Sequence, residues 1–276
     1  MTTPSIELSP GEIDDFLMAV NDRYGYDFRL YARASFTRRV QVAMSREKVD
    51  TLAALTDLLV GNADCFSRTL DALTVSVTEM FRDPATFCAL RDMVFPYLQT
   101  FSELKIWHPG CSTGEEVYSL AIFLEEAGLF NRAICYGTDI NPRALKSARE
   151  GIVKPGTLPE VTRAYIDAGG RYSFSRYYTA AYANAILAPA LKRNLLFADH
   201  NLVTDQKFGD MNLILCRNVL IYFDRELQRR VVQLLWDSLA VGGFLCLGAR
   251  EHLEGANQLA GCRVVGKAER IYQKKS

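Results

Sequence analysis

The stretch Lys105–Ser119, which reads KIWHPGCSTGEEVYS, decides the fold of this chain. It opens with a short apolar run that predicts a strand, and then passes through Pro109 and Gly110 into a polar turn with Gly114. The following segment, Glu115–Gly128, carries apolar residues at helical spacing and predicts a helix. A strand, a glycine-bearing turn and a helix are the elements with which an α/β nucleotide-type site begins.

A second strand and turn follow the first. The spacing of Gly110 and Gly114 departs from the three-glycine dinucleotide pattern, so a plain strand-to-helix turn stays open beside a cofactor loop. Ala133–Gly137 predicts the next strand, and Asp139 stands where a doubly wound sheet places an acid for ribose hydroxyls. Asn141-Pro142 then begins a helix. The acid favours the cofactor loop over the plain turn.

The composition limits the classes of partner. The chain has 276 residues, and Lys plus Arg equals Asp plus Glu at 32 each, so no global basic field indicates nucleic acid. Seven cysteines without paired spacing are typical of core residues in a reducing compartment, and three scattered histidines predict no metal site. No stretch approaches the roughly 20 apolar residues of a membrane span, and the start lacks signal-peptide features, so we expect a cytoplasmic protein.

Residues 1–72 predict a small all-α domain. One helix begins at Ser9-Pro10, a second covers Leu30–Ser45 and a third covers Val49–Val60. The second helix is rich in arginine. Its cationic side chains form either a solvated face or a docking surface for an acidic protein. If they form a docking surface, Arg33, Arg38 and Arg39 are the residues that recognise the acidic protein.

The remainder, 73–276, alternates strands and helices. Gly169–Leu195 interrupts this alternation and reads as an inserted subdomain at about 168–195, in which Ala185–Arg193 predicts a short helix. Seven strands with a final hairpin indicate a Rossmann-like mixed sheet of the SAM-dependent methyltransferase type more than a dinucleotide dehydrogenase, where SAM is S-adenosylmethionine. The later strands are expected at Leu195–Ala198, Met211–Cys216, Phe244–Ala249, Cys262–Gly266 and Arg270–Gln273.

Five motifs carry a specific likeness to a known family. They are TEMFRDP from Thr78, STGEE from Ser112, GTDIN from Gly137, DHNL from Asp199 and CRNVLIYFD from Cys216. Together they resemble the CheR family of chemotaxis-receptor glutamate methyltransferases, and the likeness runs through nearly the whole chain. It implies a protein-glutamate O-methyltransferase that acts as a monomer, without metal, on the cytoplasmic domain of a chemoreceptor. The helical domain would then recognise the receptor, and the second domain would bind SAM and release S-adenosylhomocysteine.

The resemblance also implies the residues of the site. Arg82 and Tyr222 would be catalytic, and Arg217 and Asn218 would line the pocket. The residues expected to bind SAM are Ser76, where relatives usually have Asn, and Thr78, Arg82, Gly110, Glu116, Asp139, Asn201, Leu202, Arg217 and Asn218.

Two alternatives to the receptor methyltransferase stay open. One keeps the chemistry but takes a non-receptor signalling protein as acceptor, and the other is a SAM-binding regulatory module without catalysis. The inserted subdomain supports the first, because in the family this position holds a small β-subdomain that in some members binds a tethering peptide. The helix predicted here argues against such a tether.

Overall fold

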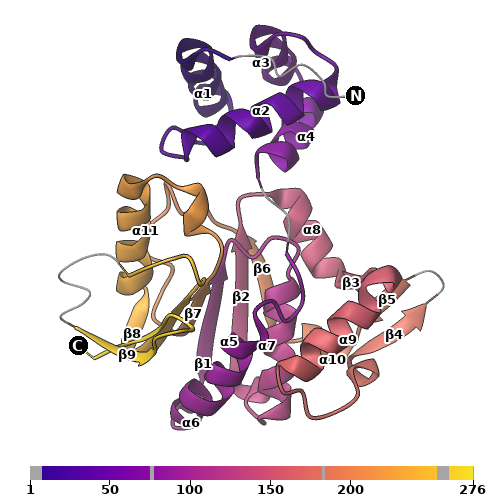
Figure 1. Cartoon of the computed structure of the whole chain (residues 1–276), viewed down its shortest axis with the longest axis vertical. Helices are drawn as coiled ribbons and strands as arrows, with labels where there is room; N and C mark the ends of the chain where they lie inside the picture. Colours follow the sequence, from indigo (N-terminus) through magenta and orange to yellow (C-terminus); the bar gives the residue numbers. More distant parts are fainter. Residues whose placement is uncertain (1–7, 75–77, 182–183, 254–260, 276) are drawn as a thin grey trace. The chain divides into compact units, whose positions relative to one another are not determined.

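The computed structural model describes residues 8–74, 78–181, 184–253 and 261–275 (Figure 1). The chain forms two compact units. The first comprises Met1–Val75 together with Ile221–Gln228, and the second comprises Ser76–Leu220 and Arg229–Ser276. A short segment from the second half of the sequence therefore belongs to the N-terminal unit.

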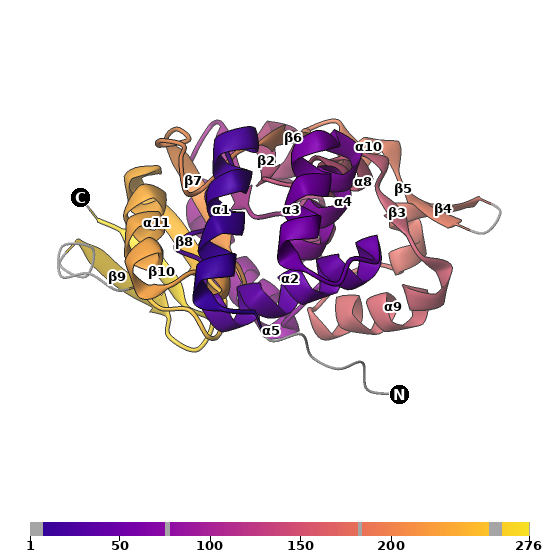
Figure 2. The same ribbon diagram turned by 90° about the horizontal axis from the view of Figure 1, so that it is seen from above.

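The first unit is helical, as the sequence predicts. Helix α1 begins with a capping box, because the backbone N–H of Ser9 donates to Glu12 and the Ser9 hydroxyl accepts from the Glu12 N–H. The buried apolar residues of these helices pack α1 against α3 and α2 against α4. Figure 2 shows the four helices from above. The helices are α1 (Pro10–Tyr24), α2 (Arg33–Glu47), α3 (Leu52–Gly61) and α4 (Ala63–Leu73).

The segment Ile221–Gln228 is tied to this unit by its backbone. The carbonyl of Tyr222 accepts a hydrogen bond of 2.9 Å from the N–H of Ala32. Two residues later, the N–H of Asp224 donates to the carbonyl of Leu30, also at 2.9 Å. Tyr222 is therefore fixed by the chain that leads into α2.

The second unit is built on a mixed sheet that has seven strands among the described residues, in the order β6-β2-β1-β7-β8-β10-β9. β10 is antiparallel to both of its neighbours, and the other pairs are parallel, which confirms the predicted sheet with its final hairpin. The strands are β1 (Leu104–Pro109), β2 (Ala133–Asp139), β6 (Leu195–Asp199), β7 (Met211–Cys216), β8 (Leu239–Leu247), β9 (Cys262–Gly266) and β10 (Ile271–Lys274).

Helices connect and cover these strands (Figure 1). The strand expected at Phe244–Ala249 begins earlier in the structure, because Gly242 and Gly243 also lie inside β8. The helical elements are α5 (Pro84–Ala89), the π-helix η1 (Leu90–Val94), α6 (Phe95–Leu98), α7 (Glu115–Glu126), η2 (Phe130–Arg132), α8 (Pro142–Glu150), η3 (Pro155–Thr157), α9 (Leu158–Asp167), η4 (Phe174–Tyr177), α10 (Pro189–Lys192), η5 (Leu220–Tyr222) and α11 (Arg225–Asp237).

Helix α7 is buried on more than one side. Apolar residues at helical spacing predict the helix, and in the structure every residue from Val117 to Leu124 is buried. The helix packs against β2, and its Phe123 ring also stacks on Phe87 at a centroid distance of 5.4 Å. This double covering holds the first turn of α7, with Glu115 and Glu116, in a fixed position.

The inserted region contains strands instead of the predicted helix. β3 (Ile152–Val153), β5 (Asn184–Leu187) and β4 (Tyr178–Ala181) pair in that order as an antiparallel sheet, at the end of the unit opposite β9 (Figure 1). The helix prediction for Ala185–Arg193 is therefore wrong up to Leu187, and only α10 is helical. Burial alternates along β5 with the period of two expected for a strand, and its pairing with β3 overrides the helix propensity of alanine.

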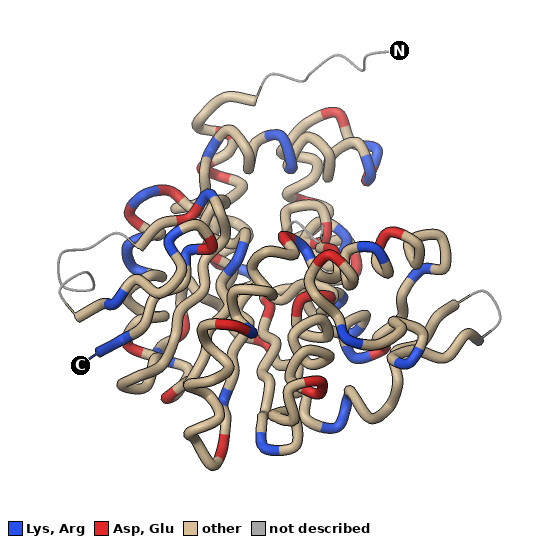
Figure 3. Tube along the Cα trace, turned by 60° about the horizontal axis from the view of Figure 1, so that its bottom comes forward, with Lys and Arg blue, Asp and Glu red and all other residues tan. Residues whose placement is uncertain are grey.

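Charges of both signs are interspersed along the trace of each unit (Figure 3). Among the helices in the described ranges, none is long and apolar enough to cross a membrane.

Candidate active site

Four parallel strands of the second unit end at the same edge of the sheet. Asp139 at the end of β2 pairs in register with Asp199 at the end of β6, and Pro109 at the end of β1 pairs with Thr138. β1 has β2 on one side and β7 on the other, so the direction of connection reverses between β1 and β7. In open α/β sheets, ligands bind beyond the carboxyl ends of the strands at such a switch point.

The loop after β1 has the tight conformation that its glycines predict. Gly110 and Gly114 have φ values of 67° and 89°, and Ser112 also lies in the left-handed region at 51°. A Cβ on Gly110 would lie 2.6 Å from Cγ2 of Val219. Packing against Val219 therefore demands a glycine here, whether or not a ligand approaches, and the role of Gly110 in cofactor binding stays a prediction.

Asp139 holds this loop through its carboxylate. Its Oδ2 accepts from the N–H of Ser112 at 2.8 Å, and its Oδ1 accepts from the N–H of Asn141 at 2.9 Å. Burial raises the pKa of Asp139, while these backbone hydrogen bonds oppose the rise. A carboxylate offers about four acceptor positions, so both oxygens keep capacity for further donors such as ribose hydroxyls.

Arg217 joins two of the sequence motifs. Its Nη1 donates to Oε2 of Glu116 at 2.7 Å, and its Nη2 donates to Oδ2 of Asp83 at 2.7 Å and to the carbonyl of Arg82 at 3.2 Å. The Arg217 side chain is only 1% exposed. Asp83 precedes α5, but its side chain makes no cap hydrogen bond to that helix and pairs with Arg217 instead. The structure thus brings the predicted residues Glu116, Arg217 and the Arg82 backbone together.

His108 completes this cluster, although no sequence motif marks it as a site residue. Its Nδ1 lies 3.2 Å from Oε1 of Glu116, and the His108 side chain is 1% exposed. Burial favours a higher pKa for Glu116, but the charge of Arg217 and the hydrogen bond with His108 outweigh it and lower that pKa below its ordinary value. Glu116 is therefore ionised at neutral pH. The only signal in the sequence is the place of His108 near the end of a strand.

Glu251 is a second residue of the site for which the sequence predicts no role. It is buried and accepts backbone hydrogen bonds of 2.6 to 3.0 Å from Gly248, Asn218, Val219 and Leu220. Burial raises the pKa of Glu251, and these donors oppose the rise. Asn218 has a φ of 60°, and this set of hydrogen bonds holds it in that left-handed conformation beside Arg217.

Unpaired polar atoms gather at the same edge of the sheet. Among the described residues, five buried side-chain atoms have no hydrogen-bond partner, and four of them follow or end β1, β6 and β7: His108 Nε2, Ser112 Oγ, His200 Nδ1 and Arg217 Nε. Buried polar atoms in proteins are normally paired. Two carboxylates also surround the single Arg217 guanidinium, which leaves an excess of negative charge. Both properties fit a polar, cationic ligand such as SAM.

The other predicted residues lie as follows. Thr78 is half-buried, and Arg82 is exposed within the second unit. The Asn201 side chain accepts from the N–H of Val203 at 2.9 Å and so forms a local turn. Tyr222 belongs to the first unit, so its catalytic pairing with Arg82 stays a prediction. Ser76 lies outside the described residues.

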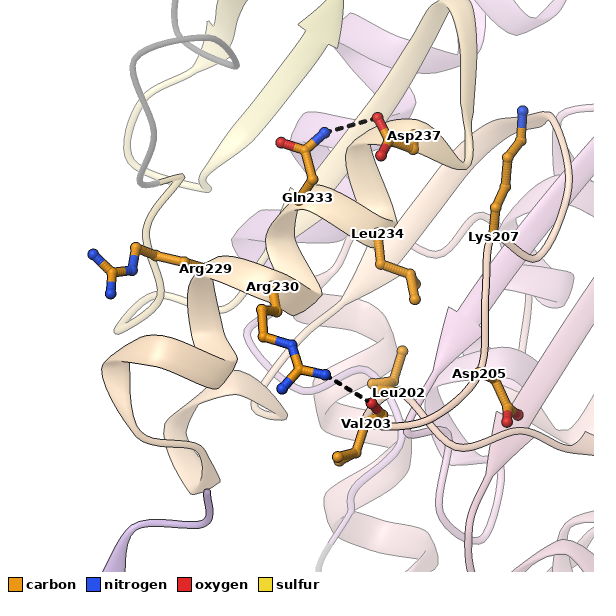
Figure 4. Close-up of a pocket in the computed structure, with 9 residues that line it drawn as sticks. All are labelled: Leu202, Val203, Asp205, Lys207, Arg229, Arg230, Gln233, Leu234 and Asp237. Carbon is orange, nitrogen blue, oxygen red and sulfur yellow. Dashed lines mark hydrogen bonds between the residues drawn. The ribbon is translucent and has the colours of Figure 1, made fainter. Parts of the chain in front are cut away.

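An open depression of about 520 Å³ lies between α11 and the loop after β6 (Figure 4). Leu202, which is expected near the adenine, lines it. Several of its polar side chains are engaged with the protein itself: Gln233 donates to Asp237 at 2.8 Å, and Arg230 donates to the carbonyl of Val203 at 3.3 Å. We therefore assign the depression no separate role. Within the described ranges, no cluster of three His, Cys, Asp or Glu side chains is placed to hold a metal ion.

Comparisons with known proteins agree with this arrangement. The family model described as CheR methyltransferase, SAM binding domain, matches residues 76–268, and that described as CheR methyltransferase, all-alpha domain, matches residues 11–74. A Pseudomonas putida protein named "Putative methyltransferase Cher3" is 44% identical over 95% of this chain and 96% of its own. "Chemotaxis protein methyltransferase 1" of Vibrio cholerae is 30% identical over 91% of this chain and 92% of its own.

Solved structures add only a weak likeness. The N-methyltransferase NodS from Bradyrhizobium japonicum, in complex with S-adenosylhomocysteine, is 16% identical, covers 61% of this chain and 62% of its own, and has a TM-score of 0.34. The family models and the similar proteins agree with the sheet order and with the helical first unit. The chain therefore belongs to the CheR family of SAM-dependent methyltransferases.

Proposed function

We propose that this methyltransferase transfers a methyl group from SAM to the γ-carboxylate of glutamates on the cytoplasmic domain of a chemoreceptor-type signalling protein. The products are glutamate methyl esters and S-adenosylhomocysteine, which makes the chain a protein-glutamate O-methyltransferase of the cytoplasm. The names of its relatives in Vibrio cholerae and Listeria, chemotaxis protein methyltransferases, support the choice of acceptor.

The cluster around Arg217 is the observation that carries this proposal. SAM supplies a methyl group on a sulfonium, which is a good leaving group. On this chain, Glu116 is ionised and lies with Asp83 around Arg217 at the switch point, so the cluster attracts an ammonium or sulfonium. Asp139 has acceptor capacity left for the ribose hydroxyls.

Transfer to a glutamate needs no general base. Its carboxyl pKa is about 4.3, so the acceptor is already ionised at neutral pH. One oxygen–carbon bond forms as the sulfur–carbon bond breaks, and the protein has to align the three atoms and exclude water. We assign the steering of the acceptor carboxylate to Arg82, which is exposed within its unit, and the orientation of the methyl to Tyr222.

The predicted helical insertion no longer speaks for a different acceptor. A helical insertion would favour a non-receptor signalling protein, but the insertion contributes the strands β4 and β5, which form a three-stranded sheet with the preceding β3. Three strands are also what the resemblance implies for a subdomain that binds a tethering peptide in some members. Such tethering of this chain is part of the proposal.

The proposal is tested with labelled SAM and a panel of purified receptor cytoplasmic fragments. A carboxyl methyl ester releases methanol in base, so we expect base-labile label on at least one fragment, and less of it with Arg82→Ala. Binding of SAM without label on any fragment would point to the regulatory module instead.

A further inference from the structure

We propose that Arg39 of α2 is a positioning residue for Tyr222. This inference rests on the proposed function, because it takes Tyr222 as a residue of the methyl-transfer site. Both residues belong to the first unit, and the evidence for the contact comes from that unit alone.

The guanidinium of Arg39 lies against the ring of Tyr222. Its Cζ is 4.5 Å from the ring centroid, which is within the range of a cation–π contact. The same group is held by the protein in two other directions, since Nη1 donates to the carbonyl of Leu73 at 2.8 Å and Nη2 donates to the hydroxyl of Ser35 at 3.1 Å. The planar guanidinium therefore has a fixed orientation, and the ring rests on a rigid support.

The surroundings of Arg39 strengthen this contact. The residue is half-buried, and burial lowers the pKa of Arg39 while the nearby Tyr222 and Tyr31 oppose that shift. Arginine remains charged at neutral pH even so. A partly desolvated cation is attracted to an aromatic face more strongly than one in water.

The backbone at Tyr222 and Phe223 is fixed by the same part of the unit. Tyr31 and Phe223 form an antiparallel bridge, and their rings meet at 5.1 Å. The Tyr222 carbonyl accepts from Ala32 at 2.9 Å. The bridge fixes the main chain, and Arg39 fixes the orientation of the Tyr222 ring. The helical unit therefore determines the position of this tyrosine.

This contact separates Arg39 from the other arginines of α2. The sequence hypothesis gives Arg33, Arg38 and Arg39 the same task of reading an acidic protein surface. Arg33 pairs with Asp14, and Arg38 is exposed. Arg39 donates hydrogen bonds to Leu73 and Ser35, and its guanidinium lies over the Tyr222 ring. It therefore acts inside the first unit.

Steady-state kinetics with a receptor fragment distinguish the two roles. If Arg39 positions Tyr222, Arg39→Ala lowers kcat about tenfold, keeps the KM for receptor and for SAM within about twofold, and is partly rescued by Arg39→Lys, which keeps the cation. Arg46→Ala, an exposed arginine of the same helix, is the matched control and leaves kcat unchanged. A raised receptor KM with unchanged kcat would overturn the inference in favour of receptor docking.

A double-mutant cycle tests the coupling itself. Removing the ring with Tyr222→Ala should abolish the effect of Arg39→Ala, whereas Tyr222→Phe keeps the ring and should preserve it. The same loss from Arg39→Ala in the Tyr222→Ala background would show independent action and overturn the proposal.

A measurement that does not depend on enzymatic activity distinguishes this inference from the proposed function. In the full chain labelled with 3-fluorotyrosine, the fluorine resonance of Tyr222 is identified by its loss in Tyr222→Phe. We expect Arg39→Ala to shift it and Arg46→Ala to leave it in place. A shifted resonance in a protein that methylates no fragment would reject the proposed function and keep the contact, while an unshifted one would reject the contact.

Discussion

Nη1 of Arg217 and Oε2 of Glu116 form an ion pair of 2.7 Å between residues that stand 101 positions apart in the chain. The pair joins the first turn of α7 to the loop after β7, and both side chains are largely buried. Breaking a buried pair leaves an uncompensated charge, so Glu116→Gln should lower the free energy of unfolding by about 3 kcal/mol. Denaturant unfolding measures this loss.

The neighbouring carboxylate provides the control for that substitution. Burial raises the pKa of Glu115, so its ionised form is disfavoured in the native state. Glu115→Gln should therefore cost less than about 1 kcal/mol. Equal losses for the two variants would contradict the role given to the Arg217 pair.

The pH dependence of the free energy of unfolding should reflect the lowered pKa of Glu116. Its native pKa is lowered from 4.5, so its contribution to the free energy of unfolding is complete above that value and disappears as pH falls through the lower native pKa. The difference between wild type and Glu116→Gln should thus be constant near neutrality and shrink in acid. A difference that grows on acidification would be inconsistent with a lowered pKa.

Asp139→Asn should weaken the binding of S-adenosylhomocysteine about tenfold. The Asp139 carboxylate accepts from the N–H groups of Ser112 and Asn141 through both of its oxygens, and we expect it to accept from the ribose hydroxyls as well. The amide of the variant keeps only one acceptor oxygen for these donors. Titration calorimetry measures the affinity. Asp199→Asn, at the register partner on β6, is the control and should leave affinity within about twofold; equal effects would remove Asp139 from the cofactor site.

Gly110→Ala should destabilise the second unit by about 3 kcal/mol. The new Cβ combines left-handed strain at a φ of 67° with a contact of 2.6 Å to Cγ2 of Val219. Gly25→Ala introduces the same left-handed strain, at a φ of 75°, but its Cβ would lie in open space. It should lower the free energy of unfolding by only about 1 kcal/mol. Val219→Ala should recover part of the loss in Gly110→Ala; thermal unfolding that shows no recovery would refute the steric explanation.

Arg38→Glu should raise the KM for the receptor fragment and leave SAM affinity unchanged. Arg38 is exposed on α2, whereas Arg33 is paired with Asp14, so we expect the reversal at Arg38 to have the larger effect. The difference between wild type and variant should diminish at high salt, since exposed charges are screened. An equal loss of SAM affinity would assign the helix to the cofactor site.

The sequence predicts the sheet well because its strands are short apolar runs bounded by glycine, proline and acids. The strand–turn–helix unit at Lys105–Ser119 and the final hairpin are confirmed. The helix expected at Ala185–Arg193 fails for a non-local reason. Alanine favours a helix, but Asn184–Leu187 pairs with Tyr178–Ala181 and with Ile152–Val153, and no local pattern reveals those partners.

The site is predictable only where a motif marks it. Glu116 and Arg217 stand in motifs, yet their direct pairing depends on the parallel register of β1 and β7. His108 and Glu251 belong to no spacing that indicates chemistry, and both become visible only through their buried hydrogen bonds. The contacts between Tyr222 and the helical unit likewise become visible only in the three-dimensional structure.

The central claim is that the acceptor is a glutamate carboxylate of a chemoreceptor, and mapping the methyl group tests it most directly. A receptor cytoplasmic fragment is incubated with the chain and SAM, digested at acidic pH and sequenced by mass spectrometry. We predict a single added methyl on particular glutamates, absent when those glutamates are changed to glutamine in the fragment and reduced with Tyr222→Phe. Methyl groups found on lysine, arginine or a terminus, or on no residue of any receptor fragment, would contradict the account.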